Sequence, residues 1–185
     1  MSPKATEDSP PSIGYLTVVQ SERTGWTGGL LVLDHVGRPL EFQCTLPVRP
    51  TRTHEILFGP TLRSHLIAEV IAGALMKKCR TRFSMLCCDQ IESLDAESLA
   101  DCPFALVAQA AEEDEGPISN DMLDGFESIE FAGTSFFVAA ERFEEARSLA
   151  AQCKDLPDPV EPFERIREAI KEAHSQLARQ HGDAA

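Results

Sequence analysis

Short apolar runs separated by turn residues dominate the N-terminal part of the chain and return in its second half. Residues 13–20, 30–34 and 40–45 are rich in leucine, β-branched and aromatic side chains, which is typical of strands. The segment HVGRP joins the last two runs, and its Gly37 accepts a positive φ, so the pattern predicts a β-hairpin there. The intervening stretch SERTGWTGG is typical of a loop.

The second half contains four more runs of strand length. Residues 83–88 and 104–109 predict two strands, and residues 127–131 and 134–139 predict a second hairpin that turns at Ala132 and Gly133. The stretch around Cys88 also admits a parallel crossover, and the pattern alone leaves that arrangement open.

Three segments have helical periodicity. After Gly59 and Pro60, which suit a helix start, Leu62, Leu66 and Val70 recur every fourth residue and predict a central apolar helix. Further helices are expected over residues 141–153 and 163–180. Because strands precede and follow the central helix, we predict an α+β fold: a single domain with a mostly antiparallel sheet packed by that helix, plus a C-terminal helix.

The last helix carries an apolar stripe with alternating spacings of three and four residues. Its members are Phe163, Ile166, Ile170, Ala173 and Leu177. Such a stripe forms the seam of a short coiled coil, but it also suits a helix that packs back onto its own domain. The sequence therefore predicts an interface on this face, either within the chain or with a second chain or another protein.

Composition shifts predict where these parts begin and end. Residues 1–12, rich in proline, serine and acidic side chains, are expected to form a disordered tail. The α+β domain then covers residues 13–154, a proline-rich spacer covers residues 155–162, and the amphipathic C-terminal helix covers residues 163–181. No stretch has the length and apolar content of a secretory signal or a membrane helix, so we expect a cytoplasmic protein without membrane contact.

Charge is distributed very unevenly along the chain. The total is −13, yet residues 38–82 hold eight basic and three acidic side chains, whereas residues 83–160 hold three basic and eighteen acidic ones. The overall charge disfavours non-specific binding of nucleic acid, because contacts to phosphate supply most of that affinity. Only the basic segment keeps nucleic acid as a possible partner.

The basic segment also supplies the candidate binding residues. Arg49, Arg52, His54 and Arg63 surround a loop that enters a helix, and guanidinium groups beside a helix N-terminus suit an anion. Solvated arginines that neutralise the acidic half are the alternative. Trp26, the one tryptophan of the chain, is either a core residue or an exposed contact for a partner.

Other features point to no reaction. The six cysteines lack the spacing of a zinc site, and the adjacent Cys87 and Cys88 are expected to be buried small hydrophobes, with a redox role as the alternative. The run Gly25 to Gly29 lacks the pattern of a phosphate-binding loop, and the acidic run Glu112 to Glu115 is typical of a solvated loop. We therefore predict no catalytic residues, no metal and no cofactor.

These observations favour a non-enzymatic interaction or regulatory module with a basic patch and an acidic half. In element order alone the chain resembles small α+β regulatory domains of the roadblock or profilin type. The alternative is an enzyme or binder that acts on a phosphorylated or nucleic-acid ligand through the region of Arg49, Arg52 and His54.

Overall fold

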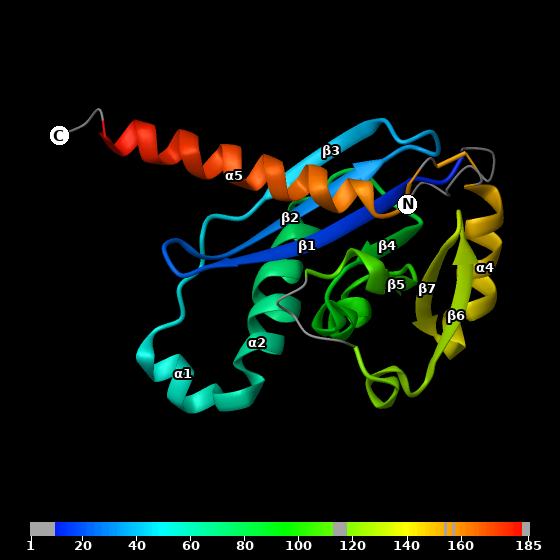
Figure 1. Cartoon of the computed structure of the whole chain (residues 1–185), viewed down its shortest axis with the longest axis horizontal. Helices are drawn as coiled ribbons and strands as arrows, with labels where there is room; N and C mark the ends of the chain where they lie inside the picture. The colour runs from blue at the N-terminus through cyan, green and yellow to red at the C-terminus, as the bar shows by residue number, and fades with distance from the viewer. Residues whose placement is uncertain (1–9, 113–117, 154, 157, 183–185) are drawn as a thin grey trace, which may run out of the picture.

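A seven-stranded mixed sheet forms the centre of the fold (Figure 1). The computed structural model describes residues 10–112, 118–153, 155–156 and 158–182. The strands are β1 (Ile13–Ser21), β2 (Gly25–Leu33), β3 (Pro39–Cys44), β4 (Met85–Cys88), β5 (Phe104–Leu106), β6 (Phe126–Phe131) and β7 (Thr134–Ala139). Their order across the sheet is β3-β2-β1-β4-β5-β7-β6.

The two predicted hairpins are confirmed, and both turn at residues with positive φ. β2 and β3 pair antiparallel around Gly37, which has a φ of 84°. β6 and β7 pair antiparallel around Ala132 and Gly133, with φ values of 48° and 78°. β1 also pairs antiparallel with β2, from Ile13 opposite Leu33 to Ser21 opposite Gly25.

The predicted α+β class is wrong, because the middle of the sheet is parallel. β4 lies parallel to both β1 and β5, which makes the fold α/β with a mixed sheet. The crossover that the sequence left open at Cys88 is therefore real. The resemblance to small α+β regulatory domains, which rested on element order, falls with this class.

The predicted central apolar helix is also corrected. The segment is divided into α1 (Arg52–Phe58), η1 (Gly59–Thr61), α2 (Leu62–Ser64), the π-helical η2 (His65–Ala72) and α3 (Gly73–Lys78). Gly59, at a φ of 50°, ends α1, and α1 buries none of its residues. The apolar periodicity predicts which side chains face the core, but it does not predict where the backbone changes from one helical form to another.

Helices cover both faces of the sheet. On one face lie η2, α3 and the 3₁₀ segment η3 (Ile91–Leu99), packed on Leu16, Val18 and Leu86. On the other lie α4 (Phe143–Gln152) and α5 (Glu161–Gly182), and Figure 1 shows α5 crossing β1 and β2. Alternate residues of β1 and β4 thus enter opposite cores.

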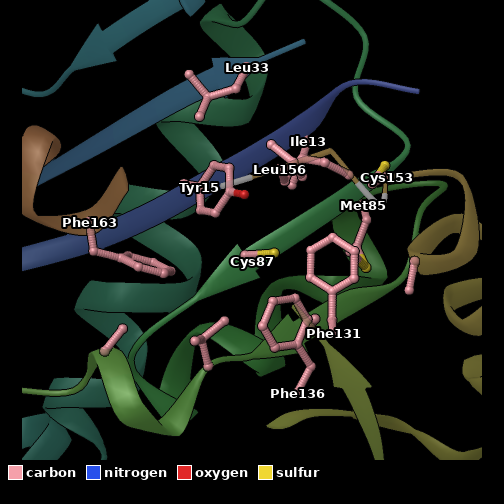
Figure 2. Close-up of a cluster of buried hydrophobic side chains, with 14 of the residues drawn as sticks. Ile13, Tyr15, Leu33, Met85, Cys87, Phe131, Phe136, Cys153, Leu156 and Phe163 are labelled. Carbon is pink, nitrogen blue, oxygen red and sulfur yellow. The ribbon is translucent and has the colours of Figure 1, made fainter. Parts of the chain in front are cut away.

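The core beneath α5 is shown in Figure 2. Phe163 of α5 packs edge-on against Tyr15 of β1, with ring centroids 5.5 Å apart. Burial raises the pKa of Tyr15. Phe131 and Phe136 of the second hairpin extend the same cluster towards α4. This packing holds α5 against the sheet over its first half.

The expected loop before residue 30 is instead the first half of β2, which begins at Gly25. A Cβ on Gly28 would lie 2.1 Å from Ile71 Cγ2 of η2, and one on Gly29 would lie 2.3 Å from Ile166 Cγ2 of α5. The two glycines thus let helices approach β2 closely from both faces.

The remaining boundaries stay predictions. Residues 1–9 of the expected tail lie outside the described residues, as do Lys154 and Pro157 near the expected spacer. Of the helices that the structure describes, none combines the length and the apolar character needed to cross a membrane.

Glu41 of β3 fixes the loop that follows α3. Its carboxylate accepts hydrogen bonds from the backbone N–H groups of Arg80 and Thr81 and from the Gln43 amide. These bonds, first that from Gln43 and then those from Thr81, lower the pKa of Glu41 from 4.5 to about 2. The loop is therefore tied to the sheet by an ionised carboxylate.

We expect the variant Glu41→Gln to remove an acid-sensitive part of the stability. Because the pKa of Glu41 is lower in the folded than in the unfolded chain, its contribution is present above pH 4.5 and is lost as the pH falls towards 2. Thermal unfolding of both proteins across that window should show the Tm difference shrinking with acidity. A difference that stays constant would contradict the assignment.

Candidate functional site

Polar side chains gather where β4 ends beside the middle of its parallel neighbour β1. Asp89 directly follows β4 and accepts a hydrogen bond of 2.7 Å from the Thr17 hydroxyl of β1. The next residue, Gln90, continues the pairing of the strands with its side-chain amide: Val18 N–H donates to its Oε1 at 3.0 Å, and its Nε2 donates to Val18 O at 2.9 Å. Thr17, Asp89 and Gln90 are all buried.

Arg167 of α5 closes this cluster from above. Its Nη2 donates to Asp89 Oδ2 at 2.5 Å and to the Ala110 carbonyl at 2.7 Å, and its Nε lies 3.3 Å from Glu112 Oε1. The side chain of Asp89 is 2% exposed and that of Arg167 is 15% exposed. The result is a buried ion pair that links α5 to the carboxyl end of β4.

Two turns further along α5, a groove opens beside the cluster. The α5 groove has a volume of about 480 Å³ and is lined by Thr24, Pro47, Arg49, His174, Leu177 and Ala178. His174 Nε2 lies 3.0 Å from the hydroxyl of the buried Thr27, which fixes the imidazole on one wall. Arg49 lines the same groove.

Backbone contacts hold Arg49 in place. Its Nε donates to the Thr24 carbonyl at 3.2 Å, and its Nη2 donates to the Arg23 carbonyl, both in the turn between β1 and β2. The neighbouring Val48 exchanges two backbone hydrogen bonds with Trp26, at 2.7 and 2.8 Å. The segment that precedes α1 is thus attached to the start of β2, and Arg49 has a defined position at the groove.

The structure disperses the other predicted anion-binding residues. Arg52 is paired with Glu55 on the exposed surface of α1, and His54 forms a capping box with Thr51 at the start of that helix. Of the four candidates, only Arg49 lines the groove. Anion binding by Arg52 and His54 stays a prediction.

Arg63 and Trp26 do come together, but in a packed arrangement. The Arg63 guanidinium lies 5.5 Å from the centre of the Trp26 ring and 2.5 Å from Glu92. Trp26 is only 9% exposed. This tryptophan is therefore a core residue, the first of the two roles that the sequence allowed.

The apolar stripe of the last helix is used mainly within the chain. Phe163, Ile166 and Ile170 are at most 1% exposed and pack on the sheet. Ala173 and Leu177 are half-buried, and Leu177 lines the groove. Of the two arrangements considered for this stripe, packing on the chain's own domain is the one observed at its first three positions. Pairing of this helix with another chain has no support.

The cysteines follow the interpretation as small hydrophobes. Cys87 and Cys88 are fully buried, and burial raises the pKa of both thiols well above 9.0. Thiols in that state are weak nucleophiles. Within the described residues, no three His, Cys, Asp or Glu side chains converge as metal ligands. Most of the acidic run, Glu113 to Glu115, lies outside the described residues.

Arg167 and His174 are site residues that no sequence pattern had predicted, and the contact of Asp89 with Thr17 had not been predicted either. One pattern does indicate Asp89: an acidic residue that directly follows the apolar run MLCC sits at the carboxyl end of a strand, where sheets of this type bind ligands. No local pattern indicates Arg167, because its partners lie 57 and 78 residues away along the chain.

No protein-family model matches the chain, and no curated protein matches it either. Among solved structures, human endonuclease V is 13% identical, with 89% of this chain and 86% of that chain covered and a TM-score of 0.44. The catalytic domain of human endonuclease V is 13% identical, with 91% of this chain and 85% of that chain covered and a TM-score of 0.43. A third structure is of Ciona intestinalis endonuclease V in complex with a 23mer DNA containing an inosine followed by a ribo-adenosine. It is 11% identical, with 88% of this chain and 86% of that chain covered and a TM-score of 0.44.

These similar structures are of endonucleases, one of them bound to DNA. The interpretation as a non-enzymatic interaction or regulatory module has no support among these structures and is not kept. At TM-scores below 0.5 the likeness assigns no activity to this chain. What the chain does has to follow from the geometry of its own residues.

Proposed function

We propose that this chain binds single-stranded nucleic acid in the α5 groove, with a backbone phosphate on Arg49 and the sugar and base along α5. The observation that carries the proposal is that a fixed guanidinium and a fixed imidazole line one groove. The groove lies at the carboxyl end of β1, the side of an α/β sheet where ligands bind.

The chemistry of both walls suits a nucleotide unit. Arg49 uses Nε and Nη2 to bind backbone carbonyls, and within the described residues its Nη1 meets no acceptor, so this nitrogen is free to donate to a phosphate oxygen. His174 adds a second nitrogen donor or acceptor. Pro47, Leu177 and Ala178 supply apolar surface for a sugar or base, and a volume of about 480 Å³ is within the usual range for small-ligand sites.

The acidic half of the chain restricts binding to this place. With a total charge of −13, the surface as a whole repels polyanions, so affinity depends on the few cations that the fold presents together. A site of this kind makes few phosphate contacts. We therefore expect weak binding with a shallow salt dependence.

The test is fluorescence anisotropy with labelled ten-nucleotide single strands of DNA and RNA and an inosine-containing strand, at low salt. Arg49→Gln should weaken binding about tenfold, the loss expected for one charged hydrogen bond. Arg52→Gln removes the same charge on α1, outside the groove, and should change the affinity less than about twofold. Ala178→Phe fills the groove without any change of charge and should also weaken binding about tenfold.

Equal losses in Arg49→Gln and Arg52→Gln would contradict the proposal, because they would show diffuse attraction instead of a site. So would binding that Ala178→Phe leaves intact. Thermal unfolding of each variant checks that the fold is kept. Incubating the same strands with Mg²⁺ and looking for shorter products tests separately whether binding leads to cleavage.

A further inference from the structure

A second cavity lies at the other end of the sheet. The α3 pocket has a volume of about 550 Å³ and is lined by Met76, Cys79, Arg80, Thr81, Arg82, Phe83, Ala100, Asp101 and Cys102. Part of its lining, residues 80–83, lies just before β4, whose first residue Met85 pairs with Ile13 at the start of β1, and another part, residues 100–102, lies just before β5. The α5 groove lies beyond the far end of β1, roughly 25 Å away at about 3.3 Å per residue. The two sites are separate.

We propose that the α3 pocket binds a mononucleotide, with its phosphate on Arg80 and Arg82. This site is independent of the α5 groove, and its ligand is a small molecule.

The cations of this region lack the ion pairs that other cations of the chain make. Across the ranges that the structure describes, the run Lys77, Lys78, Arg80 and Arg82 has no carboxylate within ion-pair distance. Elsewhere six arginines are paired with Asp or Glu: Arg52, Arg63, Arg142, Arg147, Arg165 and Arg167. In a chain with 30 acidic and 17 basic residues, cations whose side chains form no ion pair within the described residues are available to an external anion.

The backbone that carries the two arginines is fixed in advance. Glu41 accepts hydrogen bonds from the N–H groups of Arg80 and Thr81, and the Ser12 hydroxyl donates to the Arg82 carbonyl at 2.6 Å. Fixing the loop before a ligand arrives reduces the entropy lost on binding. The side chains of Arg80 and Arg82 are exposed at the mouth of the pocket.

The rest of the lining indicates what the anion is attached to. Met76 and Phe83 are half-buried and offer apolar and aromatic surface to a flat base. Asp101 supplies an acceptor for the hydroxyl groups of a ribose, and it would repel an anion at that end. One phosphate, one sugar and one base satisfy this arrangement better than inorganic phosphate does.

The two thiols in the pocket do not compete for this role. Burial raises the pKa of Cys79 to about 11 and that of Cys102 to about 12, so both are neutral at pH 7. A neutral thiol is a poor metal ligand and a poor nucleophile. The arginines remain the charged groups through which this pocket recognises a ligand.

Isothermal titration calorimetry of the full chain with adenosine 5′-monophosphate, adenosine and inorganic phosphate tests the proposal. The monophosphate should bind at least tenfold more tightly than either fragment. The double variant Arg80→Gln/Arg82→Gln should lose at least tenfold in affinity. Lys77→Gln/Lys78→Gln removes the same charge from neighbouring positions outside the pocket and should change the affinity less than about twofold. Arg49→Gln should leave it unchanged.

Several results would overturn the proposal. One is the absence of saturable binding of the monophosphate. Another is an equal loss of affinity in the two double variants. A loss of affinity in Arg49→Gln would place the nucleotide in the α5 groove. Ala100→Phe narrows the α3 pocket and keeps both arginines. If that variant binds as tightly as the wild type while thermal unfolding shows an intact fold, the pocket is not the site.

Discussion

Replacing Arg167 by methionine is expected to lower the free energy of unfolding by about 3 to 5 kcal/mol, the usual cost of removing one partner of a buried ion pair. The reason is the environment of Asp89, whose side chain is 2% exposed and whose Oδ2 accepts from Arg167 at 2.5 Å. Without the guanidinium, a carboxylate stays buried while its Oδ2 accepts from the neutral Thr17 hydroxyl. Urea unfolding of both proteins measures the difference.

A matched control separates this effect from the loss of any α5 ion pair. Arg165 lies on the same helix and is paired with Glu161, but both side chains are about 40% exposed. Arg165→Met should therefore cost no more than about 1 kcal/mol. The double variant Asp89→Asn/Arg167→Met should cost less than the sum of its single changes. If Arg167→Met costs no more than Arg165→Met, the buried cluster is not what holds α5 to the sheet.

Replacing Gly28 by alanine is expected to destabilise the chain by about 1 to 3 kcal/mol through overpacking. The added Cβ would lie 2.1 Å from Ile71 Cγ2 and 3.0 Å from Leu75 Cδ1. Ile71 is β-branched and fully buried on η2, so relief requires a shift of the helix away from β2. Thermal and urea unfolding measure the change.

Gly73, the first residue of α3, is a glycine position where an added side chain does fit. Its φ is ordinary for a helix, and the nearest atom to an added Cβ would be Leu99 Cδ1 at 3.6 Å. Gly73→Ala should therefore stabilise the chain by about 0.4 to 1 kcal/mol, because alanine loses less backbone entropy on folding. The double variant Gly28→Ala/Ile71→Ala should cost less than the sum of its two single changes, because Ile71→Ala removes the side chain that the added Cβ would contact. Equal effects of Gly28→Ala and Gly73→Ala would contradict the close approach.

The hairpins were predictable because their causes are local. Alternating apolar runs define the strands, and Gly37 and Gly133 supply the positive φ that each turn needs. The parallel pairing of β4 with β1 has no local cause. It depends on a crossover of many residues, and so the sequence pattern admitted it without selecting it. The fold class was wrong for this reason.

The start of β2 could not be predicted from the sequence pattern, because its glycines are typical of a loop. Gly28 and Gly29 resemble loop residues when only their neighbours in sequence are considered. In the structure they belong to a strand that has a helix against each face, and the absence of a side chain is what permits both contacts. The sequence shows that these two positions are glycine, whereas the packing of a helix on each face of β2 explains why a side chain does not fit there.

The candidate sites divide in the same way. Sequence alone determined that basic residues concentrate between residues 38 and 82, that the last helix has one apolar face, and that the cysteines have no metal-site spacing, since these follow from residue type and interval. Tertiary structure decided which charges remain available. It paired Arg52 and Arg63 with carboxylates, placed Arg49 in one groove with His174, and buried Asp89 under Arg167. Charge is a property of a residue, but its availability depends on which groups the fold brings within a few ångströms.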